Sequence, residues 1–334
     1  MTIRVIKPGM LTTLQDRGRH GYQHLGVVVG GAMDEWAHRL ANITVGNGEE
    51  EATLEITLQG PTLEFKEAAL IALCGAQLSA HIGEEKVPQH RPVLLRAGSR
   101  LETGNCQLGA RAYLAVAGGY GIADIMNSKS TYLPGAFGGV EGRALRKDDV
   151  LATAESLDNL YPSLQQRLQA SAAAFVAPHF AVDSVLHHMA RGTQTVRIVE
   201  GRHWQQFGPV VQGLMLNSEF SVSLNSDRMG YRLTGPALVA QSETKMISES
   251  VAFGTIQVPP DGQPIILMAD RQTTGGYPKI ASVASVDLPL LAQMQPRQSL
   301  RFVLISLQDA QQLYLAREHN IRLVKQAVAQ KQKE

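Results

Sequence analysis

VPPDGQPIILMADRQTTGGYPK, from Val258 to Lys279, joins a rigid turn, a strand and a polar loop in one short segment. Its prolines and the pair Asp261-Gly262 restrict the backbone on entry. The apolar run at 265–268 is typical of a fully buried strand. The polar run from Asp270 to Gly276 follows, and its glycines let the backbone approach a ligand closely. The segment therefore predicts a functional loop at a strand end, with a plain turn between strands as the alternative.

Short segments with strand composition recur along the rest of the chain, separated by glycine and proline. They lie at 53–58, 69–73, 111–116, 196–199, 221–224 and 300–305. This spacing favours β-barrels or sandwiches over a parallel α/β sheet. A helix is predicted from about Leu307 to the C-terminus, where Ser306 and Asp309 form a capping box.

Composition bounds the class of protein. A chain of 334 residues fits about two domains. Its 31 basic and 30 acidic residues give a formal net charge of +1, so no electrostatic footprint for nucleic acid or a membrane surface is present. Two cysteines, with no apolar targeting segment and no long apolar run, point to a soluble cytoplasmic protein.

A repeated sequence motif indicates where the domain boundaries lie. The motif L-x-G-P-x-L occurs at 58–63 and again at 233–238, about half the chain length apart, and each copy follows a predicted amphipathic helix. Duplication is the interpretation, and chance recurrence of a Gly-Pro turn is the alternative. An alanine- and glutamine-rich stretch between the copies resembles a helical connector. The predicted domains are therefore 1–155 and 193–334, with the connector at 156–192 and the terminal helix in the second domain.

Several common nucleotide-binding, metal-binding and catalytic motifs are absent from the sequence. The chain lacks a phosphate loop, C-x-x-C, H-E-x-x-H and G-x-S-x-G, and no lysine has the context of a biotin attachment site. His20 and His24 have ligand-like spacing without a carboxylate or thiolate in range, so no metal site is predicted. The pair His187-His188 is interpreted as solvated connector. Glycine-rich runs at 118–121 and 135–139 do not follow the dinucleotide-binding pattern.

Arginine lies close to glycine in four separate loops, at 15–21, 138–143, 225–230 and 270–276. Guanidinium groups bind carboxylate and phosphate in bidentate fashion, and glycine allows backbone N–H groups to help. If the loops converge, they form a site for a polar, planar or anionic ligand. If they do not, each arginine forms a surface or interdomain salt bridge.

Longer motifs carry a family resemblance over nearly the whole chain. They are PGMLTTLQDRGRHGYQHLGV at 8–27, GAMDEWAHRLANITVGN at 31–47, RAYLAVAGG at 111–119, SDRMGYRL at 226–233 and DRQTTGGYPK at 270–279. The sequence resembles the carboxyltransferase-related family that contains the C subunit of 5-oxoprolinase, allophanate hydrolase subunit 2 and the matching part of urea amidolyase. Ser250 and Asn127 stand where this family usually has glycine.

The resemblance implies a mainly β protein with two cyclophilin-like β-barrel domains. It also implies direct binding to a protein like the B subunit of 5-oxoprolinase, and assembly with a lactam-utilisation protein like the A subunit. Such hydrolase complexes open 5-oxoproline to L-glutamate, and ATP with Mg²⁺ would act through the assembled complex. Because 5-oxoproline, urea and allophanate share an N–C=O unit, the expected substrate is a small-molecule amide.

The resemblance and the four loops together give a hypothesis for the site. The candidate catalytic residues are Asp16, Arg228, Asp270, Gln272 and Thr273. The candidate substrate-binding residues are Arg19, Arg143, Ser226, Thr274, Gly275, Gly276 and Lys279. In this hypothesis Arg19, Arg143 and Arg228 bind a carboxylate or phosphate. The 272–275 run polarises the amide oxygen, and the two aspartates transfer a proton or orient an arginine.

The sequence is also compatible with three other functions. The chain could belong to an allophanate- or urea-type amide hydrolase or carboxyltransferase. It could instead be a non-catalytic regulator that antagonises a kinase inhibitor resembling the B subunit. Prolyl isomerase activity has only fold analogy in its favour, and fold does not transfer function.

Overall fold

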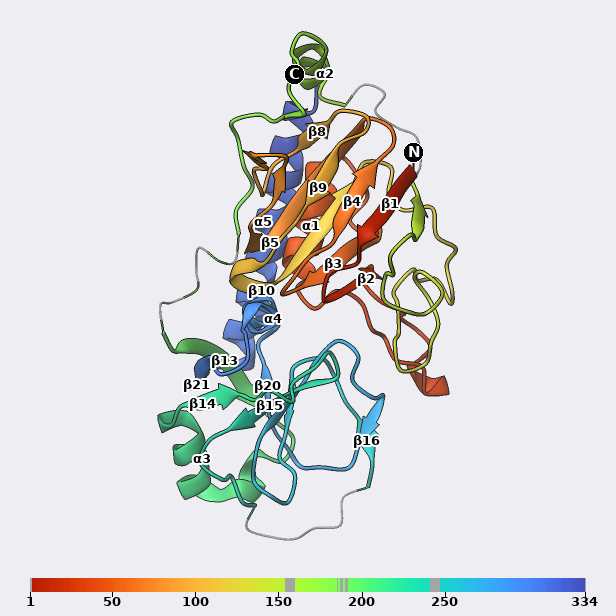
Figure 1. Ribbon diagram of the computed structural model, residues 1–334. Coiled ribbons are helices and arrows are strands. Elements are labelled where there is room, and N and C mark those ends of the chain that lie inside the picture. The colour runs from red at the N-terminus through yellow and green to blue at the C-terminus, as the bar shows by residue number, and fades with distance from the viewer. Residues whose placement is uncertain are drawn as a thin grey trace. The chain divides into compact units, whose positions relative to one another are not determined.

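The computed structural model describes residues 2–153, 160–184, 186, 189, 192–240 and 247–333 (Figure 1). The chain divides into two compact units. Unit 1 comprises Met1–Gly18, Asp34–His188 and His319–Glu334, and unit 2 comprises Arg19–Met33 and Met189–Glu318. The predicted mainly β architecture is confirmed. The pair His187-His188 of the expected connector lies outside the described residues.

Two segments belong to a unit built mostly from the other half of the sequence. Residues 19–33 belong to unit 2, and residues 319–334 belong to unit 1. The sequence-based division into contiguous ranges does not place either segment with its unit. Hydrophobic patterning shows that a short segment is buried, but not which of the two cores buries it. Duplication of the two halves stays a prediction.

Unit 1 contains two six-stranded antiparallel sheets. The first has the order β11 (Val150–Ala152), β1 (Thr2–Lys7), β4 (Thr62–Phe65), β9 (Arg100–Glu102), β6 (His81–Ile82), β7 (Glu85–Lys86). The second has the order β12 (Phe175–Val176), β8 (Val93–Leu95), β5 (Ala69–Leu78), β10 (Cys106–Val116), β3 (Thr53–Thr57), β2 (Leu11–Gln15). Helix α2 (Pro162–Gln169) lies in the expected connector.

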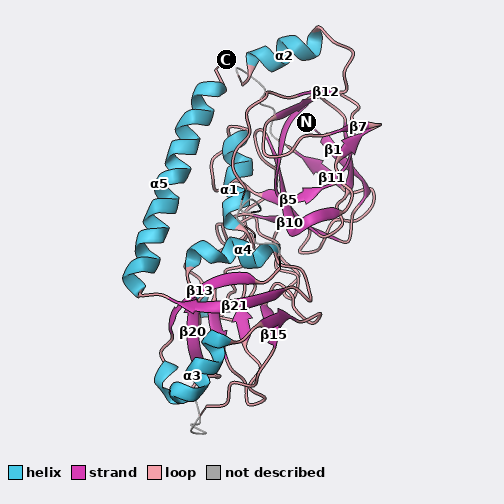
Figure 2. Cartoon of the chain, turned by 90° about the vertical axis from the view of Figure 1, so that its left-hand side faces the viewer, coloured by secondary structure: helices cyan, strands magenta, loops and turns pink. Residues whose placement is uncertain are grey.

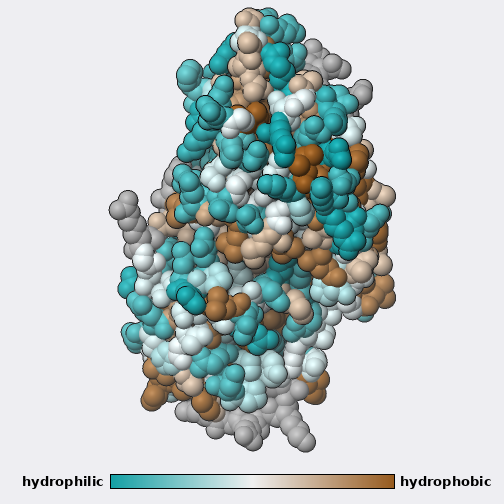
Figure 3. Space-filling model, in the orientation of Figure 1, coloured by the Kyte–Doolittle hydropathy of each residue, from teal (hydrophilic) through white to brown (hydrophobic). Residues whose placement is uncertain are grey.

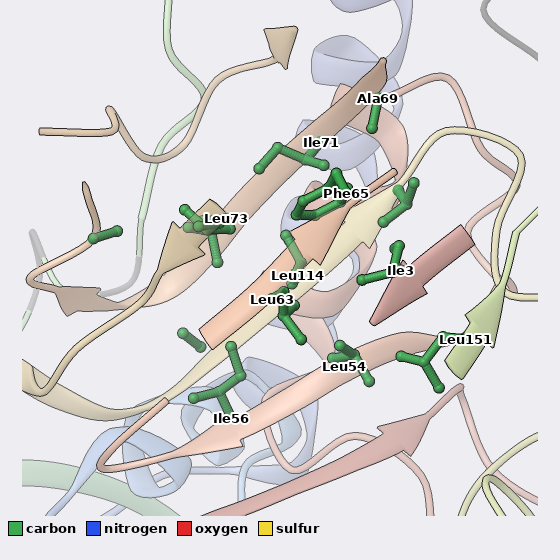
Figure 4. Close-up of a cluster of buried hydrophobic side chains, with 14 of the residues drawn as sticks. Ile3, Leu54, Ile56, Leu63, Phe65, Ala69, Ile71, Leu73, Leu114 and Leu151 are labelled. Atoms are coloured by element: carbon green, nitrogen blue, oxygen red, sulfur yellow. The ribbon is translucent and has the colours of Figure 1, made fainter. Parts of the chain in front are cut away.

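Apolar side chains of both sheets meet in one core (Figure 4). Ile3 of β1 and Phe65 of β4 come from the first sheet, and Leu54 of β3 and Leu114 of β10 come from the second. Along β1, the buried residues Ile3 and Val5 alternate with half-buried or exposed ones, which is the period of a strand with one face toward a core. Removal of this apolar surface from water is the main force that holds the sheets together.

Helix α1 (Glu35–Thr44) covers the outer face of β5 and β10, as Figure 2 shows. Asp34 caps it, because its Oδ1 accepts a hydrogen bond from the backbone N–H of Ala37 at 2.9 Å. Gly75 of β5 lets the helix approach closely, since a Cβ there would lie 3.3 Å from the Cβ of Ala37. Both faces of β5 are consequently buried, and its sequence is almost continuously apolar.

Unit 2 is built on a closed seven-stranded barrel. Its order is β13 (Gln194–Glu200), β20 (Lys279–Val283), β17 (Thr255–Gln257), β18 (Ile265–Leu267), β15 (Gly230–Thr234), β14 (Phe220–Val222), β21 (Ser299–Leu304). The parallel pairing of β21 with β13 closes the barrel. A separate ribbon pairs β16 (Glu249–Ser250) with β19 (Thr274–Gly275). The predicted buried strand in the opening segment is confirmed as β18.

Short helices accompany the barrel. They are η1 (Gln23–Leu25), η3 (Trp204–Phe207), α3 (Gly208–Asn217), η4 (Ser285–Asp287) and α4 (Leu288–Gln293). Helix α3 packs against β21 (Figure 2). The predicted C-terminal helix is α5 (Leu307–Lys331), and the backbone N–H of Asp309 donates to Ser306 Oγ at 3.0 Å, as in a capping box.

The visible surface mixes hydrophilic and hydrophobic residues, with hydrophobic side chains in separate patches (Figure 3). Within the described ranges, no helix has the length and apolarity needed to cross a membrane.

Candidate functional site

The pairing of β15 with β18 brings two of the predicted site residues together. Beyond the strand ends, the backbone N–H of Asp270 donates to the carbonyl of Arg228 at 2.8 Å. The side chains then form a bidentate ion pair, with Arg228 Nε 2.8 Å from Asp270 Oδ2 and Nη2 2.9 Å from Oδ1. Their side chains are only 7% and 3% exposed. Antiparallel register therefore positions this pair, although 42 residues separate its members in the sequence.

The ion pair also holds the 19–33 segment of unit 2. Arg228 Nη2 donates to the carbonyl of Gly31 at 2.7 Å. A Cβ at Gly30 would lie 3.5 Å from Asp270 Oδ1, and Gly30 has a φ of +66°, a conformation that favours glycine. Because both carboxylate oxygens are bound, the Arg228 guanidinium is already neutralised.

Asp16 and Arg143 lie in unit 1 and have structural partners there. Asp16 accepts hydrogen bonds from the N–H groups of Gly18 and Lys129 and from the hydroxyls of Ser128 and Ser130. These contacts organise the 128–131 turn around one buried carboxylate.

Arg143 is bound by two carboxylates. Its Nη1 lies 2.8 Å from Asp149 Oδ2, and its Nη2 lies 2.8 Å from Glu141 Oε2. Hydrogen bonding to Asp149, opposed by partial burial and reinforced by Glu141, raises the pKa of Arg143 above its ordinary value. A substrate carboxylate would have to compete with both partners.

Arg19, Ser226 and Lys279 belong to unit 2. Arg19 is fully buried, and its backbone N–H donates to the carbonyl of Val29 at 2.7 Å. Ser226 Oγ accepts from the N–H of Arg232 at 3.1 Å, which closes the turn before β15. Lys279 Nζ lies 3.1 Å from Glu249 Oε2, and this hydrogen bond lowers the pKa of Glu249.

The β16–β19 ribbon forms part of a cleft of about 770 Å³ in unit 2. Its volume lies within the roughly 300–1,000 Å³ typical of small-molecule sites. It is lined by Gln23, His24, Gly26, Ser250, Val251, Ala252, Arg271, Thr273 and Thr274. Thr273 and Thr274 are thus brought to one site with the 19–33 segment.

The other members of the predicted loop lie beside this cleft rather than along it. Gln272 and Gly276 are exposed. Gly275 is buried, and a Cβ there would fall 2.4 Å from Gln257 Nε2. Gly275 thus allows the ribbon to lie directly over a buried amide group.

Arg271 is the functional candidate to which sequence reasoning gave no role. Its Nε lies 3.5 Å from the Val251 carbonyl, its Nη1 lies 3.4 Å from the Met268 carbonyl, and its guanidinium lies over the Phe253 ring. Burial lowers the pKa of Arg271 to about 10, and the negative charge of Asp270 opposes that shift. At neutral pH the group is therefore still cationic. The sequence feature that pointed to Arg271 was its position in an arginine- and glycine-containing loop. The neighbouring side chains share that feature, so it does not single out Arg271.

The chemistry of the lining separates this cleft from a second one of about 590 Å³ in unit 2. The second cleft, between β13, the end of β21 and the start of α5, presents Glu200 and Asp309 and, among its described lining residues, no cation. The first presents a guanidinium, an imidazole, hydroxyls and an amide, and its described lining contains no carboxylate. It is suited to a small polar or anionic ligand.

Comparison with known proteins assigns the chain, rather than the cleft itself, to a family. The carboxyltransferase domain, subdomain A and B, matches residues 25–304. The chain belongs to this family. It is 36% identical to the Haemophilus influenzae protein named as the C subunit of 5-oxoprolinase, over 96% of each chain. It is also 36% identical to the Escherichia coli protein of that name, over 92% of this chain and 93% of the relative.

The solved structure of the K. lactis urea amidolyase contains a similar fold. It superimposes with a TM-score of 0.85 at 29% identity over 97% of this chain. This carboxyltransferase-family chain spans only 20% of that much longer protein.

Proposed function

We propose that the protein is the C subunit of an ATP-hydrolysing 5-oxoprolinase, which opens 5-oxoproline to L-glutamate. The observation that carries the proposal is the end-to-end match, at 36% identity, with a relative of that name. The proposed partners are a protein like the B subunit of 5-oxoprolinase, in direct contact, and a lactam-utilisation protein like the A subunit. Composition alone supports the cytoplasm as the location.

In this proposal the 770 Å³ cleft binds the lactam. The hydroxyls of Thr273 and Thr274 line it and would donate hydrogen bonds to the amide oxygen as negative charge develops there. Asp270 has both oxygens bound by Arg228, which favours a role in orienting that arginine over proton transfer. Gln272 is exposed beside the cleft and is the candidate to donate from the rim.

The residues of this cleft do not fit Mg-ATP. Mg²⁺ prefers carboxylate ligands, and a triphosphate needs several cations or a row of backbone donors. The described lining has one arginine, no lysine and no carboxylate. We therefore propose that ATP is held elsewhere in the assembled complex, and we derive no step through it on this chain.

The test is reconstitution with the A-like and B-like partners, followed by measurement of 5-oxoproline-dependent ADP release and glutamate formation. Turnover that requires this chain supports the proposal. Equal turnover without this chain contradicts it. A stable pair with the B-like partner that turns over none of 5-oxoproline, urea or allophanate would favour the regulator.

The likeness to urea amidolyase favours a second candidate, one component of a urea- or allophanate-directed hydrolase or carboxyltransferase. Because this chain spans a fifth of that protein, such an activity would also need partners. The same reconstitution with urea and a biotin-carrier protein distinguishes it, since carboxylation of urea should then exceed turnover of 5-oxoproline.

A further inference from the structure

Arg271 is the one arginine among the described residues that line the cleft, and it differs from Arg228 and Arg143 in having no ion pair with a carboxylate in the described part of the chain. Arg228 and Arg143 are each bound by at least one carboxylate in bidentate fashion. Arg271 lines the cleft, and within the described part of the chain no carboxylate forms an ion pair with it. A buried cation without an anionic partner gains most from an anion that enters its pocket.

The contacts of Arg271 fix its guanidinium while leaving one edge for a ligand. Nε and Nη1 contact the carbonyls of Val251, Met268 and Ala269, and the guanidinium carbon Cζ lies 5.7 Å from the centroid of the Phe253 ring. Among the described residues, no acceptor is bound by Nη2. These long contacts, of 3.4–3.5 Å, position the group without neutralising its charge.

We infer that Arg271 binds the carboxylate of the substrate, so that the cleft selects small monoanionic amides over neutral ones. This inference rests on the proposed function, because 5-oxoproline has both a carboxylate and a lactam amide. Arg271 would hold the carboxylate while Thr273 and Thr274 face the lactam amide. Arg228 keeps the 19–33 segment in place through Gly31 and acts as a positioning residue.

The balance of charge favours a carboxylate over a phosphate group. The only side chain among the described lining residues that carries a permanent positive charge is Arg271. Val251 and Ala252 supply an apolar portion of the wall, which suits the methylene groups of a lactam ring. A polyphosphate would leave most of its charge without a partner here.

The experiment compares Arg271→Gln and Arg271→Lys with the wild-type chain in the reconstituted complex. The matched control is Arg301→Gln, at an exposed arginine on β21 of the same barrel and outside the cleft. KM for 5-oxoproline, KM for Mg-ATP and inhibition by neutral 2-pyrrolidinone are measured for each.

For Arg271→Gln, KM for 5-oxoproline should rise on the order of 10- to 100-fold, as expected for loss of a hydrogen bond to a charged group. KM for ATP and inhibition by 2-pyrrolidinone should change little, Arg271→Lys should recover part of the loss, and Arg301→Gln should behave as wild type. An unchanged KM for 5-oxoproline overturns the inference. A rise confined to KM for ATP overturns it as well, because the anion is then a phosphate.

A second measurement needs no variant and so does not depend on folding of the substituted chain. The wild-type complex should be inhibited at least about 10-fold more weakly by the neutral carboxamide of 5-oxoproline than by a carboxylate-bearing lactam of the same size. Equal inhibition overturns the inference while 5-oxoproline turnover still stands. Absence of wild-type turnover, in contrast, contradicts the proposed function itself.

Discussion

Arg228 and Arg271 are both buried arginines of unit 2, and their surroundings give them different tasks. Arg228 binds both oxygens of Asp270 and the carbonyl of Gly31, so its donors hold the structure together. Arg271 contacts neutral carbonyls and the Phe253 ring among the described residues, and its charge is available to a ligand. The sequence places both residues in similar arginine-glycine loops. Only the positions of the nearby carboxylates distinguish them.

The ion pair leads to a prediction about stability. Asp270→Asn should destabilise unit 2 by about 3–5 kcal/mol, because it leaves the Arg228 charge buried without a partner. The measurement is the free energy of unfolding from urea denaturation. The control is Asp124→Asn at an exposed position, which should stay within about 0.5 kcal/mol of wild type.

A double variant separates loss of the pair from loss of volume. Arg228→Met with Asp270→Leu should recover much of the stability, since replacing both members with apolar groups removes the uncompensated charge. Equal stability of Asp270→Asn and wild type would contradict the assignment of a structural role to this pair.

At the scale of elements, the β16–β19 ribbon links the barrel to the cleft. Ser250 of β16 and Thr274 of β19 pair in register and both line the cleft. The next residue, Gly275, packs over the buried amide of Gln257. The position of the threonines therefore depends on a residue that has no side chain.

Two glycine substitutions in unit 2 should have opposite effects. Gly275→Ala should destabilise by about 1–3 kcal/mol, because its Cβ would lie 2.4 Å from Gln257 Nε2 in a buried site. Gly213→Ala, inside α3 with its nearest neighbour at 4.0 Å, should stabilise by about 0.5–1 kcal/mol. Thermal unfolding of the two variants tests both predictions. A melting temperature of Gly275→Ala at or above that of wild type would refute the close-packing argument.

At the scale of the whole molecule, each unit takes a segment from the far end of the chain. Met33 is fully buried in the core of unit 2, and the 19–33 segment supplies Gln23, His24 and Gly26 to the cleft. In unit 1, the end of α5 buries Ile321 and Val328. Neither unit is therefore complete within one contiguous half of the sequence.

Separated halves should reveal this arrangement. A fragment of residues 193–334 lacks Met33 and the Gly31 carbonyl that Arg228 binds, so it should lose at least about 2–5 kcal/mol of stability. Urea denaturation compares it with residues 189–318 joined by a flexible linker to a copy of 19–33. Equal stability of the two proteins would show that the 19–33 segment does not complete the unit 2 core.

Much of the fold follows from local patterns. The alternation in β1, the apolar run of β18, the helix capped by Asp34 and the start of α5 at Ser306 each depend on neighbours in sequence. The candidate site is less predictable, because hydrogen-bond partners such as Arg228 and Asp270 meet only through strand register. Asp16 and Arg143 have the same loop composition, yet their nearby donors and carboxylates occupy them within unit 1.

The sequence by itself determined the β-rich class, the family and the strand inside the 258–279 segment, since these depend on residue types and their spacing. Only the tertiary structure decided which arginine is neutralised and which lines a cleft. It also assigned residues 19–33 to unit 2. The physical reason is that electrostatic pairing and core packing depend on distances between residues far apart in the chain, and composition and periodicity do not contain those distances.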